Sequence, residues 1–259
     1  MRPHWRGTLL YPASLVALFL GLQGLLGLVG VPAGQQASLA ALPSVAALLF
    51  SLPLRLQRAW GDKHPWKRLG VRCSWEELIH SLSRGVLLAA ALLLVIVVAL
   101  LLGGAHADLR LTGALVLNAV VLGLGVGFAE ELLFRGWLFG ELTLLLGHQR
   151  ALWLQAAIFS LVHTRFHLPG LQLVLLLGGL GLFGVLLAEQ RDRDRGLLWG
   201  AVGLHGGAVG GWFLLSQGVL TLQTAGPAWL VSPANPIGGV VGWIALALLL
   251  MGLRHRSMT

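Results

Sequence analysis

The chain has 259 residues, of which 56% are hydrophobic and only 11% are charged, against about 25% charged residues in ordinary soluble domains. This composition excludes a soluble globular domain and a disordered chain, and the long unbroken apolar runs exclude a transmembrane β-barrel. The formal charge of +8 does not indicate nucleic-acid binding, because the basic residues flank apolar runs as topology signals do. We therefore expect an all-α polytopic membrane bundle that forms a single integral domain over residues 1–259. The one cysteine excludes an internal disulfide.

The apolar runs predict about eight membrane spans. Arg2 and Arg6 ahead of the first run also resemble the start of a signal peptide, but the run is long and no convincing cleavage site follows, so we expect an uncleaved span. The fourth span is expected to lead into a shorter, partly re-entrant or interfacial helix at 135–147, because charges interrupt the run. The predicted spans are 8–31, 36–53, 83–104, 112–134, 151–166, 168–188, 196–216 and 237–253.

The charges outside these spans predict the orientation of the chain. With both termini in the cytoplasm, every Lys and Arg lies on the cytoplasmic side except Arg110, Arg135 and Arg165, as the positive-inside rule favours. The cytoplasmic segment at about 55–84 is basic and reads as a capped amphipathic helix near the headgroups. The uncharged segment 217–236 is expected to be an external loop. We expect a bacterial-type inner or plasma membrane.

Charged residues inside a span cost at least about 2.5–3.5 kcal/mol each and are therefore functional candidates. Glu130 and Glu131 project about 100° apart on a helix. Glu131 can pair with Arg135 at i, i+4, which leaves Glu130 without a local cation and pointing elsewhere, as a candidate general base. The alternative is a structural Glu–Arg pair with one solvated glutamate. Glu141 is expected to be solvated near the interface.

Two histidines interrupt later apolar runs. His163 follows Phe159 by four residues, so the two share a helix face. His205 lies in a glycine-rich helix, where the glycines indicate either close helix packing or a cavity that reaches the histidine. A lone histidine on an apolar face is often only a satisfied core residue. Taken together, the residues allow two chemistries: Glu130 and His163 activate a water while His205 stabilises an oxyanion, or all three ligate a zinc ion.

The order of these motifs resembles the CPBP family of intramembrane endopeptidases, the CAAX proteases and bacteriocin-processing enzymes, also called the Abi family. The matching patterns are E-E-x-x-x-R at 130–135 with the following "FRG", F-x-x-x-H at 159–163, and the intramembrane His205. The resemblance covers about 112–216. It implies an eight-span bundle whose cavity opens to the cytoplasmic side.

By resemblance, Glu130 is the water-activating base, His163 assists it, Glu131 and Arg135 support the site, and His205 helps stabilise the oxyanion. No cofactor is favoured, and zinc on Glu130, His163 and His205 is the alternative. The family pattern often continues H-x-x-x-N, with the asparagine as a second oxyanion donor. Val209 stands at that position here. Loss of one such donor costs about 100- to 1000-fold in rate, unless another group such as the Trp212 indole replaces it.

The leading hypothesis is a peptidase that cleaves a peptide bond near the cytoplasmic membrane face with a glutamate-activated water. Its substrate would be a protein or peptide, with a lipidated one included. A membrane scaffold or immunity protein that has kept the site is the second class, and Val209 favours it. A proton-coupled transporter is the third, since Glu and His also form proton relays, although no repeat symmetry supports it.

Overall fold

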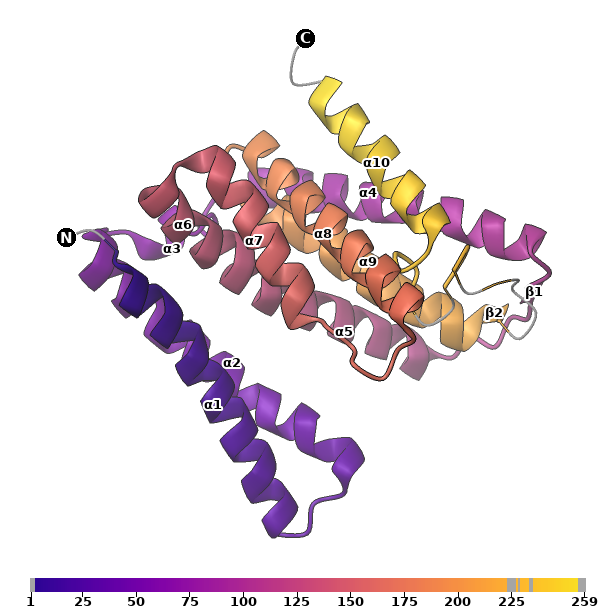
Figure 1. Ribbon diagram of the computed structural model, residues 1–259, viewed down its shortest axis with the longest axis horizontal. Helices are drawn as coiled ribbons and strands as arrows, with labels where there is room; N and C mark the ends of the chain where they lie inside the picture. Colours follow the sequence, from indigo (N-terminus) through magenta and orange to yellow (C-terminus); the bar gives the residue numbers. More distant parts are fainter. Residues whose placement is uncertain (1–2, 223–226, 228, 233–234, 256–259) are drawn as a thin grey trace.

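The computed structural model describes residues 3–222, 227, 229–232 and 235–255, and these residues form a helical bundle (Figure 1). A two-stranded antiparallel ribbon at one end pairs His106 with Thr221. The elements are α1 (Trp5–Leu28), α2 (Ala33–Trp60), α3 (Pro65–Arg68), α4 (Trp75–Leu102), β1 (His106–Ala107), α5 (Gly113–Glu131), the π-helix η1 (Leu132–Leu138), α6 (Phe139–Leu146), α7 (His148–Val162), α8 (Gly170–Arg193), α9 (Trp199–Gly218), β2 (Leu220–Thr221) and α10 (Val240–His255).

Each of the eight predicted spans coincides with a helix. Among the described residues, five helices are long and apolar enough to cross a membrane by length and composition: α1, α2, α4, the continuous α5–η1–α6 unit, and α8. The shorter α10 is also apolar. Two helices at predicted spans are not among these six: α7, which has only 15 residues, and the glycine-rich α9, which has 20. The chain is an all-α membrane bundle.

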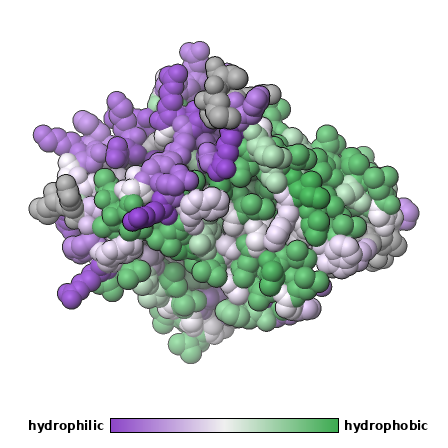
Figure 2. Space-filling model, turned by 45° about the horizontal axis from the view of Figure 1, so that its top comes forward, coloured by the Kyte–Doolittle hydropathy of each residue, from purple (hydrophilic) through white to green (hydrophobic). Residues whose placement is uncertain are grey.

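The helices alternate in direction, so the bundle has two ends. The basic end is formed by the starts of α1, α4, α7 and α9 together with the last turns of α2, α6, α8 and α10 (Figure 1). The far end is formed by the opposite helix termini and carries the β1–β2 ribbon. Hydrophilic residues gather over one end in Figure 2, while hydrophobic residues cover most of the remaining face. This division is typical of a protein that places its middle in lipid.

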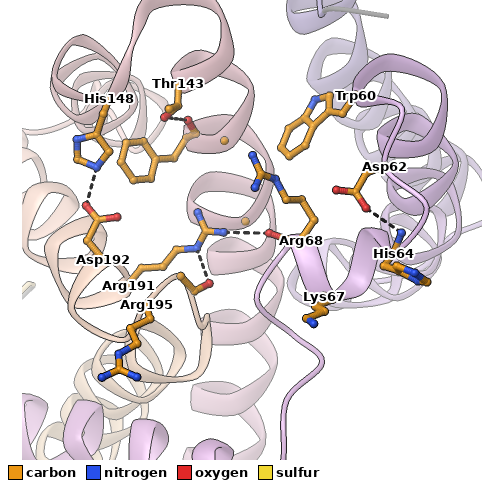
Figure 3. Close-up of a pocket in the computed structure, with 14 residues that line it drawn as sticks. Trp60, Asp62, His64, Lys67, Arg68, Thr143, His148, Arg191, Asp192 and Arg195 are labelled. Carbon is orange, nitrogen blue, oxygen red and sulfur yellow. Dashed lines mark hydrogen bonds and ion pairs between the residues drawn. The ribbon is translucent and has the colours of Figure 1, made fainter.

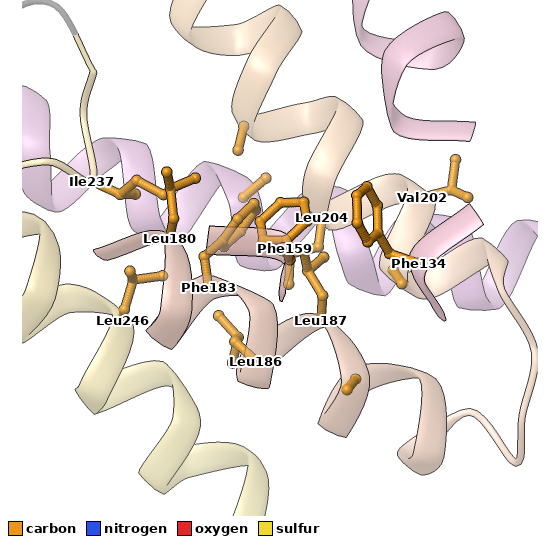
Figure 4. Packing of buried hydrophobic residues seen from close by; sticks show 14 of the residues in the cluster. Phe134, Phe159, Leu180, Phe183, Leu186, Leu187, Val202, Leu204, Ile237 and Leu246 are labelled. Carbon is orange, nitrogen blue, oxygen red and sulfur yellow. The ribbon is translucent and has the colours of Figure 1, made fainter. Parts of the chain in front are cut away.

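α9 lies at the centre of the bundle, packed between α4 and α5. A Cβ on Gly203 would overlap the Leu82 carbonyl oxygen of α4, and one on Gly206 would come within 2.5 Å of the Gly123 carbonyl oxygen of α5. The sequence left two explanations for the glycines of this helix, close helix packing or a cavity. These two glycines allow close packing. Small residues allow membrane helices to approach in this way. The buried Leu204 points from α9 into the core of Figure 4.

We expect Gly203→Ala to destabilise the protein by about 1–3 kcal/mol, because the added methyl group must displace the α4 backbone. The measurement is the midpoint of thermal unfolding of the purified protein in detergent. Gly125→Ala is the matched control, since a Cβ at Gly125 meets nothing within 4 Å. Equal midpoints for the two variants would contradict the tight α4–α9 contact.

The predicted break between a span at 112–134 and a separate helix at 135–147 is wrong. One helix runs from Gly113 to Leu146, with the π-helical turns of η1 in its middle. The charges that suggested a break are paired inside the protein, so the helix does not have to end there. A π-helical insertion widens the helix locally and is frequent at functional sites.

The predicted solvation of Glu141 is also wrong. Its side chain is fully buried and forms an ion pair with Arg55 of α2. It also accepts hydrogen bonds from Thr8 of α1 at 2.7 Å and from the indoles of Trp60 at 2.9 Å and Trp137 at 2.7 Å. Glu141 therefore ties the α1–α2 hairpin to α6 at the basic end, a role that needs partners far away in sequence.

The segment between the second and third predicted spans is shorter than expected. α2 continues to Trp60 and α4 already begins at Trp75. The predicted cap is present, because Ser74 and Glu77 form a capping box at the start of α4. The predicted amphipathic helix is therefore the first part of the long helix α4. Of the predicted external loop at 217–236, residues 223–226, 228 and 233–234 lie outside the described residues, as do Arg2 and Arg256 of the predicted cytoplasmic ends.

Candidate active site

The three candidate catalytic side chains meet between α5, α7 and α9. Glu130 stands on the last turn of α5, and its Oε2 lies 3.3 Å from Nε2 of His163 and 3.9 Å from Nε2 of His205. Glu130 Oε2 is buried and accepts no hydrogen bond from the described residues. Buried carboxylate oxygens normally have a donor, and the nearest candidate for this one is His163 Nε2. Glu130 does point away from Arg135, as the spacing predicted.

His163 follows the last residue of α7 and is held by its own helix. Its Nδ1 lies 2.7 Å from the Phe159 carbonyl oxygen. A carbonyl oxygen only accepts, so Nδ1 donates the hydrogen. This leaves Nε2 to face Glu130. The side chain is one third exposed, so it borders the pocket rather than filling the core.

His205 is held by a buried ion pair on the neighbouring helix. Its Nδ1 donates to Glu131 Oε1 at 2.7 Å, and Arg135 Nη1 donates to the same oxygen at 2.8 Å. Glu131 and Arg135 are fully buried and His205 nearly so. Arg135 also donates to the Gly184 carbonyl oxygen of α8 at 3.3 Å. A carboxylate on the far nitrogen fixes the orientation of a histidine ring.

Aromatic rings enclose the two histidines. Phe159 of α7 lies 4.7 Å from the His163 ring and 5.8 Å from the His205 ring, between centroids. The Arg135 guanidinium stands 4.2 Å above the Phe159 ring. Phe183 of α8 meets His205 edge to face at 5.4 Å. These rings, which appear with Phe134 in Figure 4, limit the contact of the buried charges with water and strengthen their interactions.

A cavity of about 360 Å³ adjoins these side chains. Glu130, His163 and His205 line it, and so do Val209 and Trp212 on successive turns of α9. Most of the remaining lining is apolar. Its other lining residues are Leu122, Val126, Phe159, Arg165, Leu180, Phe183, Ala208, Phe213, Ser216, Asn235, Pro236 and Ile237.

The same three side chains are also the ligand set of the zinc alternative. Two histidines and a glutamate are a ligand set that zinc accepts in catalytic sites. Within the residues that the structure describes, however, no group of three or more His, Cys, Asp or Glu side chains is arranged to hold a metal ion. The nitrogen atoms of His163 and His205 face the Glu130 oxygen, and their other nitrogens are engaged by protein acceptors.

Two residues of the site, Gln155 and Phe183, and one contact of Glu131 were missed from the sequence. The spacing of Glu131 and Arg135 predicted their pair, but not that Glu131 also binds His205. Gln155 donates to the Gly184 carbonyl oxygen at 3.1 Å, the same atom that Arg135 contacts. Phe183 stood in an apolar run with no distinguishing signal. Gln155 was the one detectable feature, as a lone amide within a predicted span.

Residues 112–210 match the family model described as type II CAAX prenyl endopeptidase Rce1-like. This stretch of the chain is similar to that family. The matched residues include all the elements from α5 to α8 and the part of α9 that carries His205 and Val209. It supports peptidase activity in an integral membrane protein. No curated protein and no solved structure matched the chain.

Proposed function

We propose that this protein is an intramembrane endopeptidase in which Glu130 activates a water for attack on a peptide carbonyl. The observation that supports it best is Glu130 Oε2, which is buried, lacks a donor among the described residues, and lies 3.3 Å from His163 Nε2. A general base must stand within hydrogen-bond reach of the proton that it removes. A cavity of about 360 Å³ lies beside it.

In the proposed reaction Glu130 takes a proton from water as the oxygen bonds to the carbonyl carbon. The tetrahedral intermediate then collapses, the carbon–nitrogen bond breaks, and the amide nitrogen leaves with a proton. His163 Nε2, next to Glu130, receives the proton from Glu130 and passes it to the leaving nitrogen, which restores the Glu130 carboxylate. Its Nδ1–H bond to the Phe159 carbonyl oxygen keeps the ring aimed at the site. The products are a new carboxylate and a new amine.

His205 is the group placed to stabilise the oxyanion. Its Nδ1 donates to Glu131, so its Nε2 donates only when both nitrogens carry a proton. Preorganised donors in such a site contribute several kcal/mol to the barrier. Glu131 and Arg135 are positioning residues in this scheme.

The test compares the termini of membrane proteins in cells that carry the wild-type chain or Glu130→Gln at equal expression. We expect a set of peptide ends that is present with the wild type and absent with the variant. Those ends would identify both the substrate and the cleaved bond. Identical sets of ends at full depth would contradict proteolysis and favour a scaffold or immunity role, which the loss of the family asparagine at Val209 already suggests.

Val209 stands one turn after His205 and lines the same cavity. We expect Val209→Asn to raise the cleavage rate, toward the factor of about 100 that a second oxyanion donor provides. The measurement is the rate on a peptide that carries the cleavage sequence, with Val209→Leu as the apolar control. An unchanged rate in a folded variant would contradict the missing-donor account and assign the role to the Trp212 indole.

Metal removal gives a second expected outcome. Because the side chains are not arranged to hold a metal ion, we expect cleavage to survive extended dialysis against a strong chelator with no loss of rate. Metal analysis of the dialysed protein is the control. Loss of activity that returns on addition of zinc would overturn the glutamate mechanism in favour of a metal-dependent one on the same three residues.

A further inference from the structure

The basic end of the bundle holds a pocket of about 540 Å³ that shares no lining residue with the catalytic cavity (Figure 3). Trp60, Thr143 and Asp192 line it, so it lies where the ends of α2, α6 and α8 come together. The helix ends of a membrane bundle lie at the level of the lipid headgroups, where tryptophan is enriched. The cations that line this pocket are Lys67, Arg68, Arg191 and Arg195.

The two acids of this pocket are engaged by other groups. Asp192 pairs with the His148 ring at 2.8 Å, and Asp62 accepts a hydrogen bond from the His64 backbone N–H at 2.7 Å, as the dashed lines of Figure 3 show. Among the described residues, none of the four lining cations forms a salt bridge with an acid. The pocket therefore carries an excess of positive charge.

Arg191 is the buried cation of this pocket, with only 9% of the residue exposed. Its guanidinium donates to the carbonyl oxygens of Arg135 at 2.6 Å, Gly196 at 3.2 Å and Arg68 at 3.4 Å. A guanidinium has five N–H groups, so two of them have no acceptor among the described residues. Carbonyl oxygens carry no full charge, and a buried charge is costly unless it is paired. An anion in the pocket would supply both the charge and the acceptors.

A second pocket of about 870 Å³ adjoins the first and extends its positive surface. The two pockets share Lys67 and Arg195, and the second adds Lys63 and Arg72. Glu77 of α4 is the only acid that lines the second pocket. Over the combined surface, Lys and Arg outnumber Asp and Glu.

Arg195 has a backbone conformation that glycine adopts more readily. Its φ is 55°, in the left-handed region that is unfavourable for a residue with a Cβ. It lies in the turn between α8 and α9, next to Gly196, whose carbonyl oxygen accepts from Arg191. An arginine therefore stands here at a conformational cost, as residues of binding sites often do.

We propose that these two pockets bind the phosphate of an anionic phospholipid headgroup. Phosphate oxygens accept the charge-assisted hydrogen bonds that guanidinium groups donate, and basic pockets between transmembrane helices bind such headgroups. The place of the pockets at the helix ends, with Trp60 in the wall, favours a lipid over a soluble phosphate ester. The lipid site does not depend on the proposed peptidase function.

The test measures the thermal midpoint of the purified protein in detergent as phosphatidylglycerol is added. We expect the midpoint to rise by about 5 °C when the lipid is about 100-fold above its dissociation constant. Phosphatidylcholine with the same acyl chains has no net headgroup charge and is expected to give no such rise. Glycerol phosphate at the same concentration supplies the phosphate without acyl chains, and it is also expected to leave the midpoint unchanged.

The double variant Lys67→Gln, Arg68→Gln removes two lining charges. We expect its apparent affinity for phosphatidylglycerol to fall about 5-fold for each lost charge. Arg150→Gln is the matched control, because Arg150 is an exposed cation of the basic end that lines neither pocket. Arg191 is left in place, since its three carbonyl contacts join separate segments of the fold.

Arg195→Gly separates the cation from the fold. Glycine relieves the unfavourable φ, so the midpoint without lipid is expected to be at least that of the wild type, while the response to phosphatidylglycerol weakens. A full response in this variant or in the double variant would overturn the site, and so would an equal loss in Arg150→Gln or an equal rise with phosphatidylcholine. An equal rise with glycerol phosphate would overturn the lipid as the ligand and assign the pockets to a soluble phosphate compound.

Discussion

Purified Glu130→Gln is expected to hydrolyse a peptide carrying the cleavage sequence about 10²- to 10⁴-fold more slowly than the wild type, the range that a general base contributes. The amide keeps the shape of the side chain but cannot take a proton from water. Because Glu130 forms an ion pair with no Lys or Arg among the described residues and lies only beside the two histidines, the fold should not depend on its charge. The thermal midpoint is therefore expected to stay close to that of the wild type.

Glu189→Gln is the matched control for this loss. Glu189 is also a helix carboxylate, but it binds Arg254 at the basic end, outside the site. Its replacement should leave the rate unchanged. Full activity of Glu130→Gln would refute the proposed mechanism, and equal loss in both variants would trace the effect to something other than the site.

Arg135→Ala is expected to cost about 3–5 kcal/mol of stability, because it leaves the Glu131 carboxylate buried with no cation beside it. The change also removes the bond to the Gly184 carbonyl oxygen and the guanidinium over the Phe159 ring. The measurement is thermal unfolding in detergent together with the yield of folded protein. The double variant Glu131→Gln, Arg135→Met leaves no unpaired charge and should be more stable than Arg135→Ala.

The two predictions separate positioning from chemistry. A double variant that recovers stability but not the cleavage rate would indicate that the Glu131–Arg135 pair is needed to orient His205. If Arg135→Ala were as stable as the wild type, the ion pair could not be buried as the structure has it. The comparison needs only folded protein and one peptide substrate.

Local features of the site could be predicted from the sequence because they depend on helix spacing. The Glu131–Arg135 pair, the Phe159–His163 contact and the Ser74 cap all lie within one turn of a helix. The helices that carry the three motifs could be recognised in the sequence, because each has a charged or aromatic residue within an apolar run. The catalytic roles of these residues stay predictions.

Contacts between helices could not be predicted. α5 and α9 are apolar around most of their circumference, so neither sequence indicates which face turns toward the other. Glu131 and His205 are separated by 74 residues, and Glu141 meets Thr8 across 133. A buried glutamate and a solvated one have the same local sequence pattern, which is why Glu141 was predicted to be solvated.

The attachment of the α1–α2 hairpin has a consequence for the surrounding lipid. Glu141 fixes the hairpin at the basic end, whereas its remaining length diverges from the bundle (Figure 1) and leaves Val16, Leu25 and Leu42 exposed. Acyl chains must fill the wedge between the hairpin and α5. The tilt of the hairpin is then set by bilayer thickness rather than by protein contacts, so thinner and thicker membranes would hold this arm at different angles while the catalytic helices stay in place.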